Sequence, residues 1–481
     1  MDTKPSRGLQ PSSWPSFKHT LAVFALMAGG WGCAVAGGDT NGSVSLLVKS
    51  RTPLTPDLIS AISSHASHVA YVWPEINAMA MSVPLSKMGE LVADPAVALV
   101  EPDSQVQPED GSSDSSAGTS SAVSTMVPPF ASTGSLQTWN LSMAQTAGTG
   151  FSGKGVTVAV VDSGLPQNWP EFLPLTSVDL THAAGFGPEG WGDFHNPVNA
   201  VRGVGGHIGL FPHGLAVASI IVGFPSEFGP VGGAAPGATI LPIRVINQFN
   251  YSWFSWWTAG ILYVGRLKRD GVLPGPVVIN FSSQAVGDSQ IVKDAIDFTI
   301  GQGVIFVTIA GNFGPAPGSI AFPGRLPESI TAGAVGWTGE FDTPEWFFDA
   351  VPPNDPAQVY VARFSGREPG TVPPGSLIDV LAPGSFVFGE WLIGPGFSDG
   401  REVAFDSISN FIFGTSFACP HVTGIVAQML EKNPALTQAQ VEAILKDTAL
   451  AIPPVPFAWG PDATGHGLAR GSAAVAATPG P

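Results

Sequence analysis

The pattern of apolar positions divides the chain into differently built stretches. Residues 44–107 form a compact unit whose short apolar segments predict a β-α-β-β-α-β order. Its expected strands lie near 45–48, 69–73, 78–83 and 97–100, and its expected helices over 55–65 and 85–93. Residues 108–135 are rich in Ser, Ala and Gly, so they predict a flexible linker that proteases can cut.

Beyond residue 135, apolar runs alternate with helical patterns. Continuous β-branched runs predict strands buried on both faces, at 156–161, 239–243, 277–280 and 304–307. Helical spacing predicts helices at 256–267, 291–301, 416–431 and 437–448. This alternation predicts an α/β fold of three layers, with a mainly parallel central sheet, and such sheets place ligands at the carboxyl ends of their strands.

The first residues have the pattern of a secretory signal peptide. Lys4, Arg7 and Lys18 precede an apolar run over 21–36, and this run of about 16 residues is shorter than a membrane span. It ends in Ala34-Val35-Ala36, a small-residue cleavage pattern. We therefore expect residues 1–36 to be removed and the protein to be secreted, extracellular or periplasmic, with no membrane segment left. A short buried helix and a lipid anchor at Cys33 are the alternatives.

Composition excludes several classes of protein. The chain has 481 residues with 20 Lys+Arg and 37 Asp+Glu, a net charge of −17 that disfavours nucleic acid as a partner. Its 59 glycines and 45 prolines predict many loops and turns, while 44% hydrophobic residues suffice for a core. The two cysteines, Cys33 and Cys419, cannot make a disulfide scaffold.

Four polar residues stand at predicted strand ends or helix starts. They are Asp162, His213, Asn312 and Ser416. Each alone has an ordinary structural explanation as a turn, cap or core residue. A single Val161-Asp162-Ser163-Gly164 also resembles the aspartic-protease motif, but that family needs two such segments. Ser416 lacks the G-x-S-x-G elbow of the α/β-hydrolases.

Together these segments resemble the subtilisin-like serine proteases. The most specific match is Gly414-Thr415-Ser416-Phe417-Ala418-Cys419-Pro420-His421-Val422-Thr423-Gly424, similar to G-T-S-M-A-S-P-H-V-A-G. Further matches follow in the family's order, at 155–164, 233–236, 278–282, 309–314 and 382–384. The resemblance implies a subtilisin-like peptidase domain over 136–481. It also implies an inhibitor-like propeptide over 44–107, ferredoxin-like in fold and similar chiefly at 94–101, with maturation in the linker over 108–135.

The resemblance assigns the four residues roles in peptide-bond hydrolysis. Ser416 would be the nucleophile and His213 its base, with Asp162 holding the imidazole. Asn312 would donate a hydrogen bond to the oxyanion. The enzyme would be a self-inhibited pre-pro-enzyme that acts on polypeptides, has its own propeptide as inhibitor and needs no cofactor for catalysis.

The resemblance also implies a substrate cleft. One side would be a strand of Asn250, Tyr251 and Ser252, and the other side Ser282, Ser283 and Gln284. The primary specificity pocket would be lined by Ile309, Ala310, Gly311 and Ala321. Because this lining supplies no charge, we expect the pocket to accept uncharged, apolar side chains. The bond between Phe322 and Pro323 is expected to be cis, as the matching family bond is.

Some features depart from the family pattern. The usual H-G-T-H is His213-Gly214-Leu215-Ala216, and Phe413 stands where Asn is common. These changes motivate an alternative function, a catalytically inactive subtilase-fold binding protein. The family's calcium loop would fall at 224–229, where the usual Asn ligand is not evident. A metal site from His182, His195 and His207 lacks the usual ligand spacing.

Overall fold

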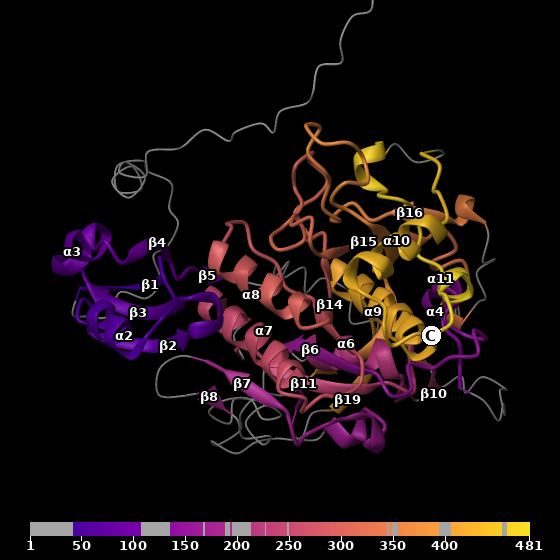
Figure 1. The fold of residues 1–481 in the computed structure, drawn as a ribbon. Coiled ribbons are helices and arrows are strands. Elements are labelled where there is room, and N and C mark those ends of the chain that lie inside the picture. Colours follow the sequence, from indigo (N-terminus) through magenta and orange to yellow (C-terminus); the bar gives the residue numbers. More distant parts are fainter. Residues whose placement is uncertain are drawn as a thin grey trace, which may run out of the picture. The chain divides into compact units, whose positions relative to one another are not determined.

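The central sheet of the computed structural model is built on strands whose side chains are apolar on both faces. Its order is β16-β15-β14-β13-β6-β11-β7-β8, with β17 paired to β15 (Figure 1). The strands are β6 (Thr157–Asp162), β7 (Ala184–Phe186), β8 (Asp193–Phe194), β11 (Thr239–Arg244), β13 (Val277–Phe281), β14 (Val304–Ile309), β15 (Ile330–Trp337), β16 (Val359–Val361) and β17 (Val380–Pro383). All pairs are parallel except β7–β8 and β15–β16. The predicted α/β fold with a mainly parallel sheet is confirmed.

The structure describes part of the chain. Described residues are 42–106, 135–166, 169–187, 193–194, 213–226, 228–247, 250–343, 346–348, 355–393, 406–454 and 459–481, with backbone alone at 193–194, 391–393 and 406–410. All of them belong to one compact unit, Gly37–Pro481. The predicted signal peptide and nearly all of the predicted linker lie outside the described residues.

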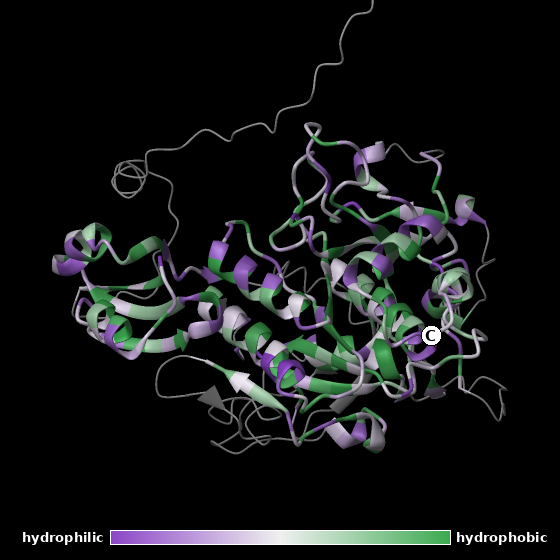
Figure 2. Ribbon diagram, viewed as in Figure 1, coloured by the Kyte–Doolittle hydropathy of each residue, from purple (hydrophilic) through white to green (hydrophobic). Residues whose placement is uncertain are grey.

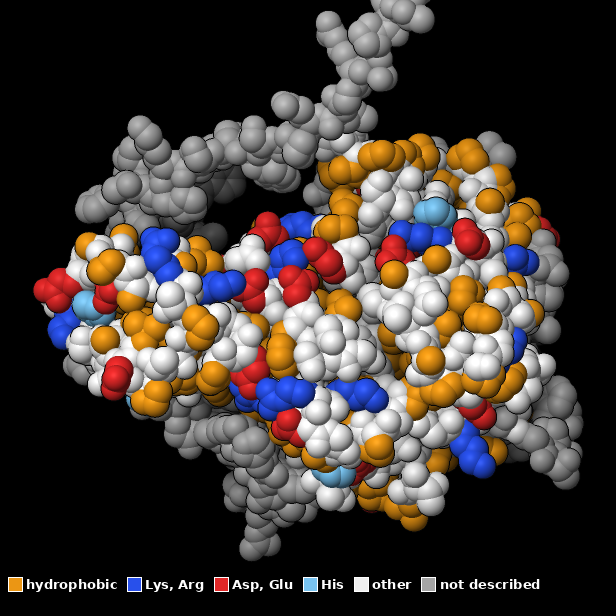
Figure 3. All heavy atoms as spheres, viewed as in Figure 1, with side chains coloured by type: hydrophobic (Ala, Val, Ile, Leu, Met, Phe, Trp, Pro, Cys, Tyr) orange, Lys and Arg blue, Asp and Glu red, His pale blue; other side chains and the backbone are white. Residues whose placement is uncertain are grey.

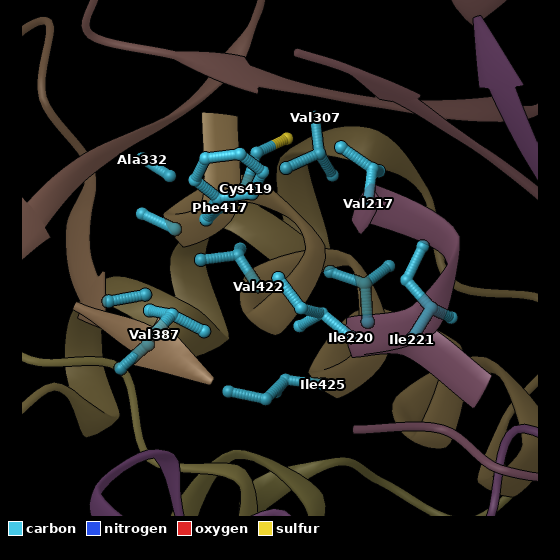
Figure 4. Close-up of a cluster of buried hydrophobic side chains, with 14 of the residues drawn as sticks. Val217, Ile220, Ile221, Val307, Ala332, Val387, Phe417, Cys419, Val422 and Ile425 are labelled. Atoms are coloured by element: carbon cyan, nitrogen blue, oxygen red, sulfur yellow. The ribbon is translucent and has the colours of Figure 1, made fainter. Parts of the chain in front are cut away.

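Helices cover both faces of the sheet because successive strand residues point to opposite sides. In β6, Val158 and Val160 pack in a cluster with α6 (His213–Val222) and α9 (Thr415–Lys432). Ala159 and Val161 pack instead with α7 (Phe254–Arg269) and α8 (Gln290–Gly301). Figure 4 shows the first cluster, with apolar side chains of α6 and α9 facing each other.

Shorter elements complete the described structure. The remaining helices are α4 (Trp139–Ala144), α10 (Gln438–Thr448), which begins with a capping box at Thr437, and α11 (Gly471–Ala477). The remaining strands are β5 (Gln105–Val106), β9 (Phe224–Ser226), β10 (Gly229–Val231), β12 (Ser252–Trp253), β18 (Val387–Ile393) and β19 (Asp406–Ile412). Single 3-10 turns lie at Trp169–Glu171, Leu175–Ser177, Trp346–Phe348, Pro356–Gln358 and Pro461–Ala463.

Residues 43–102 form a separate antiparallel sheet of order β2-β3-β1-β4. Its elements are β1 (Ser43–Ser50), α2 (Pro56–Ser63), β2 (His68–Trp73), β3 (Ala78–Pro84), α3 (Met88–Ala93) and β4 (Val97–Pro102), with 3-10 turns at Pro74–Ile76 and Leu85–Lys87. Alternation again separates two faces: Leu46 and Val48 pack in this part's own core. Leu47 belongs to the cluster that contains α7 and α8.

Hydropathy follows this architecture. Figure 2 shows that the strands of the central sheet are predominantly apolar, while the helices carry both apolar and polar residues. Figure 3 shows acidic and basic side chains in small mixed groups between uncharged atoms on the visible face, as expected when only 12% of residues are charged. No helix among the described residues is long and apolar enough to cross a membrane.

Candidate active site

Asp162 and His213 form a buried pair at the carboxyl end of the sheet. Asp162 ends β6 and His213 opens α6, and both side chains have no exposed surface. His213 Nδ1 lies 2.8 Å from Asp162 Oδ1 and 2.9 Å from Oδ2. Because a carboxylate can only accept, Nδ1 carries the proton and Nε2 is left as the basic nitrogen.

Two further contacts fix the orientation of this pair. The Ser163 N–H donates to Asp162 Oδ1 at 2.6 Å, and the Gly214 N–H donates to Ser163 Oγ at 2.9 Å. Gly214 approaches the loop so closely that a Cβ would stand 2.5 Å from the Gly164 carbonyl oxygen. The departures Leu215 and Ala216 are buried in the core formed by α6 and α9, so they serve packing at these positions.

Ser416 stands at the start of α9. It is the second residue of the helix and is fully buried. The ring of the next residue, Phe417, lies 5.4 Å from the His213 imidazole. Ser416 Oγ donates to the Ser282 carbonyl at 3.2 Å, which ties the helix start to the end of β13. The fold therefore joins Asp162 of β6 to His213 of α6, and Ser416 directly precedes the residue of α9 whose ring lies against His213.

Asn312 is held by both its backbone and its side chain. Asn312 Oδ1 accepts hydrogen bonds from Thr415 N–H at 2.9 Å and from Thr415 Oγ1 at 2.8 Å. Since both donors face Oδ1, the amide orientation is fixed and Nδ2 is turned away from Thr415. The Asn312 N–H donates to Gln284 Oε1 at 2.6 Å. An oriented amide donor thus stands next to the residue that precedes Ser416.

Several of the residues predicted to line the cleft contact one another, and Ser282 also contacts Ser416. Ser282, Ser283 and Gln284 follow β13 directly and are fully buried. Ile309 ends β14, Ala310 accepts the Ala321 N–H at 2.9 Å, and a Cβ on Gly311 would stand 2.3 Å from the Ala321 Cβ. The predicted cis bond at Phe322-Pro323 is confirmed.

The predicted strand over Asn250, Tyr251 and Ser252 is wrong in its bounds. The strand is Ser252–Trp253, because Asn250 has a left-handed φ of 59° that no strand residue adopts. The Asn250 N–H instead donates to the Asn247 carbonyl at 3.1 Å. Tyr251 is 39% exposed, whereas Ser252 is fully buried.

His421 and Cys419, which lie outside the candidate triad, have environments that indicate a structural role. His421 Nε2 accepts from Asn140 Nδ2 and Nδ1 donates to the Phe417 carbonyl, both at 2.8 Å, and burial lowers the pKa of His421 to about 4. Burial raises the pKa of Cys419 to about 12, so this free thiol stays neutral. Within the described residues, no three His, Cys, Asp or Glu side chains could together hold a metal ion. His195, His207 and Glu227 lie outside that part of the chain.

Sequence reasoning missed the residues that hold the candidate site in place. Three such residues form side-chain hydrogen bonds in the site: Ser163, Thr415 and Asn280. Each lies within two residues of a predicted site residue. Their place inside the matching motifs was the available signal. Two of these partners come from distant segments, because Ser163 and Gly214 are 51 residues apart and Asn312 and Thr415 are 103 residues apart, so spacing could not reveal them.

Comparison with known proteins agrees with this geometry. The model of the subtilase family matches residues 153–472. Subtilisin E of Bacillus subtilis (strain 168) is 27% identical over 302 residues, 62% of this chain and 62% of its own. Fervidolysin of Fervidobacterium pennivorans is 29% identical over 335 residues, 67% of this chain and 41% of its own. The chain thus matches less than two thirds of the length of these relatives.

Solved structures show the same fold. The structure of fervidolysin, described as a keratinolytic enzyme related to subtilisin, superposes with a TM-score of 0.62 at 22% identity, covering 91% of this chain and 61% of that one. Sphericase superposes with a TM-score of 0.52 at 22% identity, covering 69% of this chain and 97% of that one. With the family model matching well over half of its residues, the chain belongs to the subtilase family.

Proposed function

We propose that this protein is a serine endopeptidase whose triad is Asp162, His213 and Ser416. The observation that carries the proposal is the buried Asp162–His213 pair, with Nδ1 and Oδ1 2.8 Å apart, facing the helix start that bears Ser416. A serine hydroxyl is a weak nucleophile and needs such an oriented base. Family membership makes this reaction the natural use of the site.

In the proposed reaction, Ser416 Oγ attacks the carbonyl carbon of a peptide bond while His213 Nε2 takes the hydroxyl proton. The carbonyl oxygen becomes an oxyanion, which the Ser416 N–H and Asn312 Nδ2 stabilise by hydrogen bonds. His213 then gives the proton to the leaving amine, and the acyl-enzyme is hydrolysed by water through the same steps in reverse. Asp162 stabilises the imidazolium throughout.

We further propose that residues 44–107 are a propeptide that inhibits the enzyme. Their last strand, β5, pairs antiparallel with β12, with Val106 opposite Ser252. Ser252 belongs to the segment expected to bind extended substrate. The end of the proposed propeptide therefore pairs with a residue of the segment where substrate is expected to bind, which supports a self-inhibited precursor.

Charged contacts join this propeptide to the two helices on one face of the sheet. Glu101 accepts backbone N–H bonds from Gln290 at 3.2 Å and Ile291 at 3.3 Å, at the start of α8. Asp103 accepts the Ser255 N–H at 2.9 Å, at the start of α7. Carboxylates at helix N-termini are favoured by the exposed N–H groups and the helix dipole. Further along, Glu75 forms a bidentate pair with Arg266 at 2.9 Å.

Secretion and maturation complete the proposal. The signal-like residues 1–36 would direct export, and cleavage within 103–135 would release the propeptide. The substrates would be polypeptides, and no cofactor enters the proposed steps. Amino-terminal sequencing of the secreted protein tests maturation: a start before Asp94 would contradict it.

A fluorophosphonate probe tests the catalytic role of Ser416. It reacts with serines that a neighbouring base activates, so the wild-type protein should be labelled and Ser416→Ala should not. Ser376→Ala is the matched control, because that hydroxyl donates to the Pro373 carbonyl away from the site. An unlabelled wild-type protein that has lost its propeptide would favour the alternative function, an inactive binding protein.

A further inference from the structure

A proline interrupts the hydrogen bonds of α9 at the residue that bears the candidate nucleophile. Pro420 lies inside α9, four residues after Ser416. Proline has no N–H, so the Ser416 carbonyl loses the helical donor that would normally come from residue 420. A buried carbonyl left without a donor costs about 1–3 kcal/mol, so another group is expected to supply the hydrogen bond.

Ser282 supplies that donor. Its hydroxyl donates to the Ser416 carbonyl at 2.9 Å, and Ser416 Oγ in turn donates to the Ser282 carbonyl at 3.2 Å. The two residues therefore bond each other twice. Because Ser282 follows β13 directly, the helix start is fastened to the centre of the sheet.

Two more buried side chains continue from Ser282. Asn280 Nδ2 donates to Ser282 Oγ at 2.8 Å, and Thr423 Oγ1 donates to Asn280 Oδ1 at 3.0 Å. None of these side chains has exposed surface. Asn280 itself is the partner of Val160 and Val307 in the neighbouring strands, which leaves its backbone little freedom.

The hydrogen bonds that run from Thr423 through Asn280 and Ser282 form a series that ends at the Ser416 carbonyl, and this acceptor fixes the direction of every bond. The Ser416 carbonyl can only accept, so the Ser282 hydroxyl must donate to it. Ser282 Oγ then accepts from the Asn280 amide nitrogen, and the Asn280 oxygen is left to accept from Thr423. Such bonds polarise one another in a low-dielectric interior. Thr423 and Ser416 are seven residues apart on α9, so both face the same side of the helix.

We propose that Asn280, Ser282 and Thr423 are positioning residues that hold the Ser416 backbone in place for catalysis. The inference rests on the proposed function, because it assigns them a role in aiming the Ser416 hydroxyl and N–H at the substrate carbonyl. A displacement of about 1 Å at such a group can cost on the order of 100-fold in rate. The series restores rigidity where Pro420 removes it.

Thr423→Val tests the proposal with an isosteric change outside the reacting groups. The full chain is expressed and allowed to mature, and the rate constant of fluorophosphonate labelling, kcat and KM are measured. We expect labelling and kcat to fall about tenfold with KM changed less than twofold, because orientation and not binding is lost. Thr299→Val is the matched control: it is a buried threonine whose hydroxyl donates to the Ile261 carbonyl at 3.1 Å.

Asn280→Asp adds a second measurement, the pH dependence of labelling, which would not change if Asn280 had only a structural role. A carboxylate accepts from Thr423 but cannot donate to Ser282 Oγ, so the Ser282 hydroxyl turns toward it and away from Ser416. When protonated, the carboxyl donates again. The ratio of variant to wild-type labelling should therefore rise as the pH falls through the pKa of this buried acid. The Asp162–His213 pair is common to both proteins, and Cys419 stays neutral.

The outcomes separate this inference from the proposed function. We expect the probe to label the wild-type protein, to label Thr423→Val more slowly and to label Thr299→Val at the wild-type rate. The ratio of Asn280→Asp to wild-type labelling should change with pH. Any of three results, with the wild-type protein labelled, would overturn the positioning role alone. Thr423→Val could be labelled as fast as the wild type, Thr299→Val could be slowed as much as Thr423→Val, or the Asn280→Asp ratio could be constant with pH. A wild-type protein that is mature and unlabelled would overturn the proposed function instead.

Discussion

Asp103 accepts the backbone N–H of Ser255 at 2.9 Å, although the two residues are far apart in sequence. Ser255 is the second residue of α7, so the carboxylate caps a helix that covers the sheet. Burial raises the pKa of Asp103 to about 6, and burial likewise raises the pKa of Glu101, which caps α8. The proposed propeptide is thus joined to the proposed enzyme through acids that are harder to ionise than exposed ones.

This relationship predicts how pH affects the stability of the precursor. The pKa of Asp103 is raised above its ordinary value of 3.8, so the folded state binds this proton more tightly than the unfolded state. The contribution of Asp103 to the free energy of unfolding is fully present below about pH 4 and is lost as the pH rises through about 6. In a full chain blocked by Ser416→Ala, the Tm should therefore fall with rising pH relative to the same chain carrying Asp103→Asn.

The difference between the two melting curves across pH 4–7 is the measurement, since acids common to both proteins cancel. Asp447→Asn is the control because Asp447 is exposed. If the two plots of Tm against pH were parallel, the pKa of Asp103 would be the same in the folded and unfolded states, contrary to its burial at the contact with Ser255.

How far the sequence predicted the structure depended on how local each signal was. The strand at 156–161 was predicted because six consecutive apolar or β-branched residues mark a strand buried on both faces; the structure has Thr157–Asp162. The strand expected over 250–252 was misplaced because Asn250 has a left-handed conformation and donates its N–H to the Asn247 carbonyl. No prediction was made for β18 and β19, which pair with each other in antiparallel fashion although they are separate segments of the chain.

The same distinction holds for the candidate site. Asp162, His213 and Ser416 were named from short motifs, and the structure brings their segments together. The supporting contacts were not named, since the bond between Thr423 and Asn280 joins residues 143 positions apart. Motifs record which residues occur together, and the fold decides which of them touch.

Replacing Gly214 should disrupt the Asp162–His213 pair. In Gly214→Ala the new Cβ would stand 2.5 Å from the Gly164 carbonyl oxygen and 3.3 Å from Asp162 Oδ1, so the start of α6 must shift. We expect a loss of about 1–3 kcal/mol in the free energy of unfolding and a fall of more than tenfold in kcat/KM. Gly287→Ala is the matched control, because nothing lies within 4 Å of its added Cβ. Equal activity of both variants would contradict the tight packing at Gly214.

Removing the Asn312 amide donor should lower turnover more than binding. Asn312→Asp keeps an oxygen for Thr415 but replaces Nδ2, the proposed oxyanion donor, with an acceptor. We expect kcat to fall by a factor on the order of 10²–10³, the figure known for the side-chain amide donor of subtilisin, with a much smaller change in KM. A variant that loses KM and keeps kcat would assign Asn312 to substrate binding instead.

Thr415 should act through Asn312. Thr415→Val removes one of the two hydrogen bonds that orient Asn312 Oδ1, the one at 2.8 Å, and keeps the backbone bond at 2.9 Å. We expect a severalfold fall in kcat, smaller than that of Asn312→Asp, because the amide keeps one anchor. A double-mutant cycle decides the matter: Thr415→Val should add almost nothing in an Asn312→Leu background, where no amide remains to orient. Additive losses would show an independent role for the Thr415 hydroxyl.

The residues expected to line the specificity pocket predict a side-chain preference. Ile309 and Ala321 are fully buried and apolar, and Gly311 lies close against Ala321. Nearby Arg325 has its charge matched by Asp288 at 2.6 Å, so it leaves no excess charge for a substrate. We therefore expect the mature protein to cleave a peptide library after uncharged, apolar residues, because a charged side chain would lose its hydration without gaining a partner. Ser416→Ala is the blank for contaminating proteases, and a strong preference for Lys or Arg would overturn this assignment of the pocket while leaving the triad untouched.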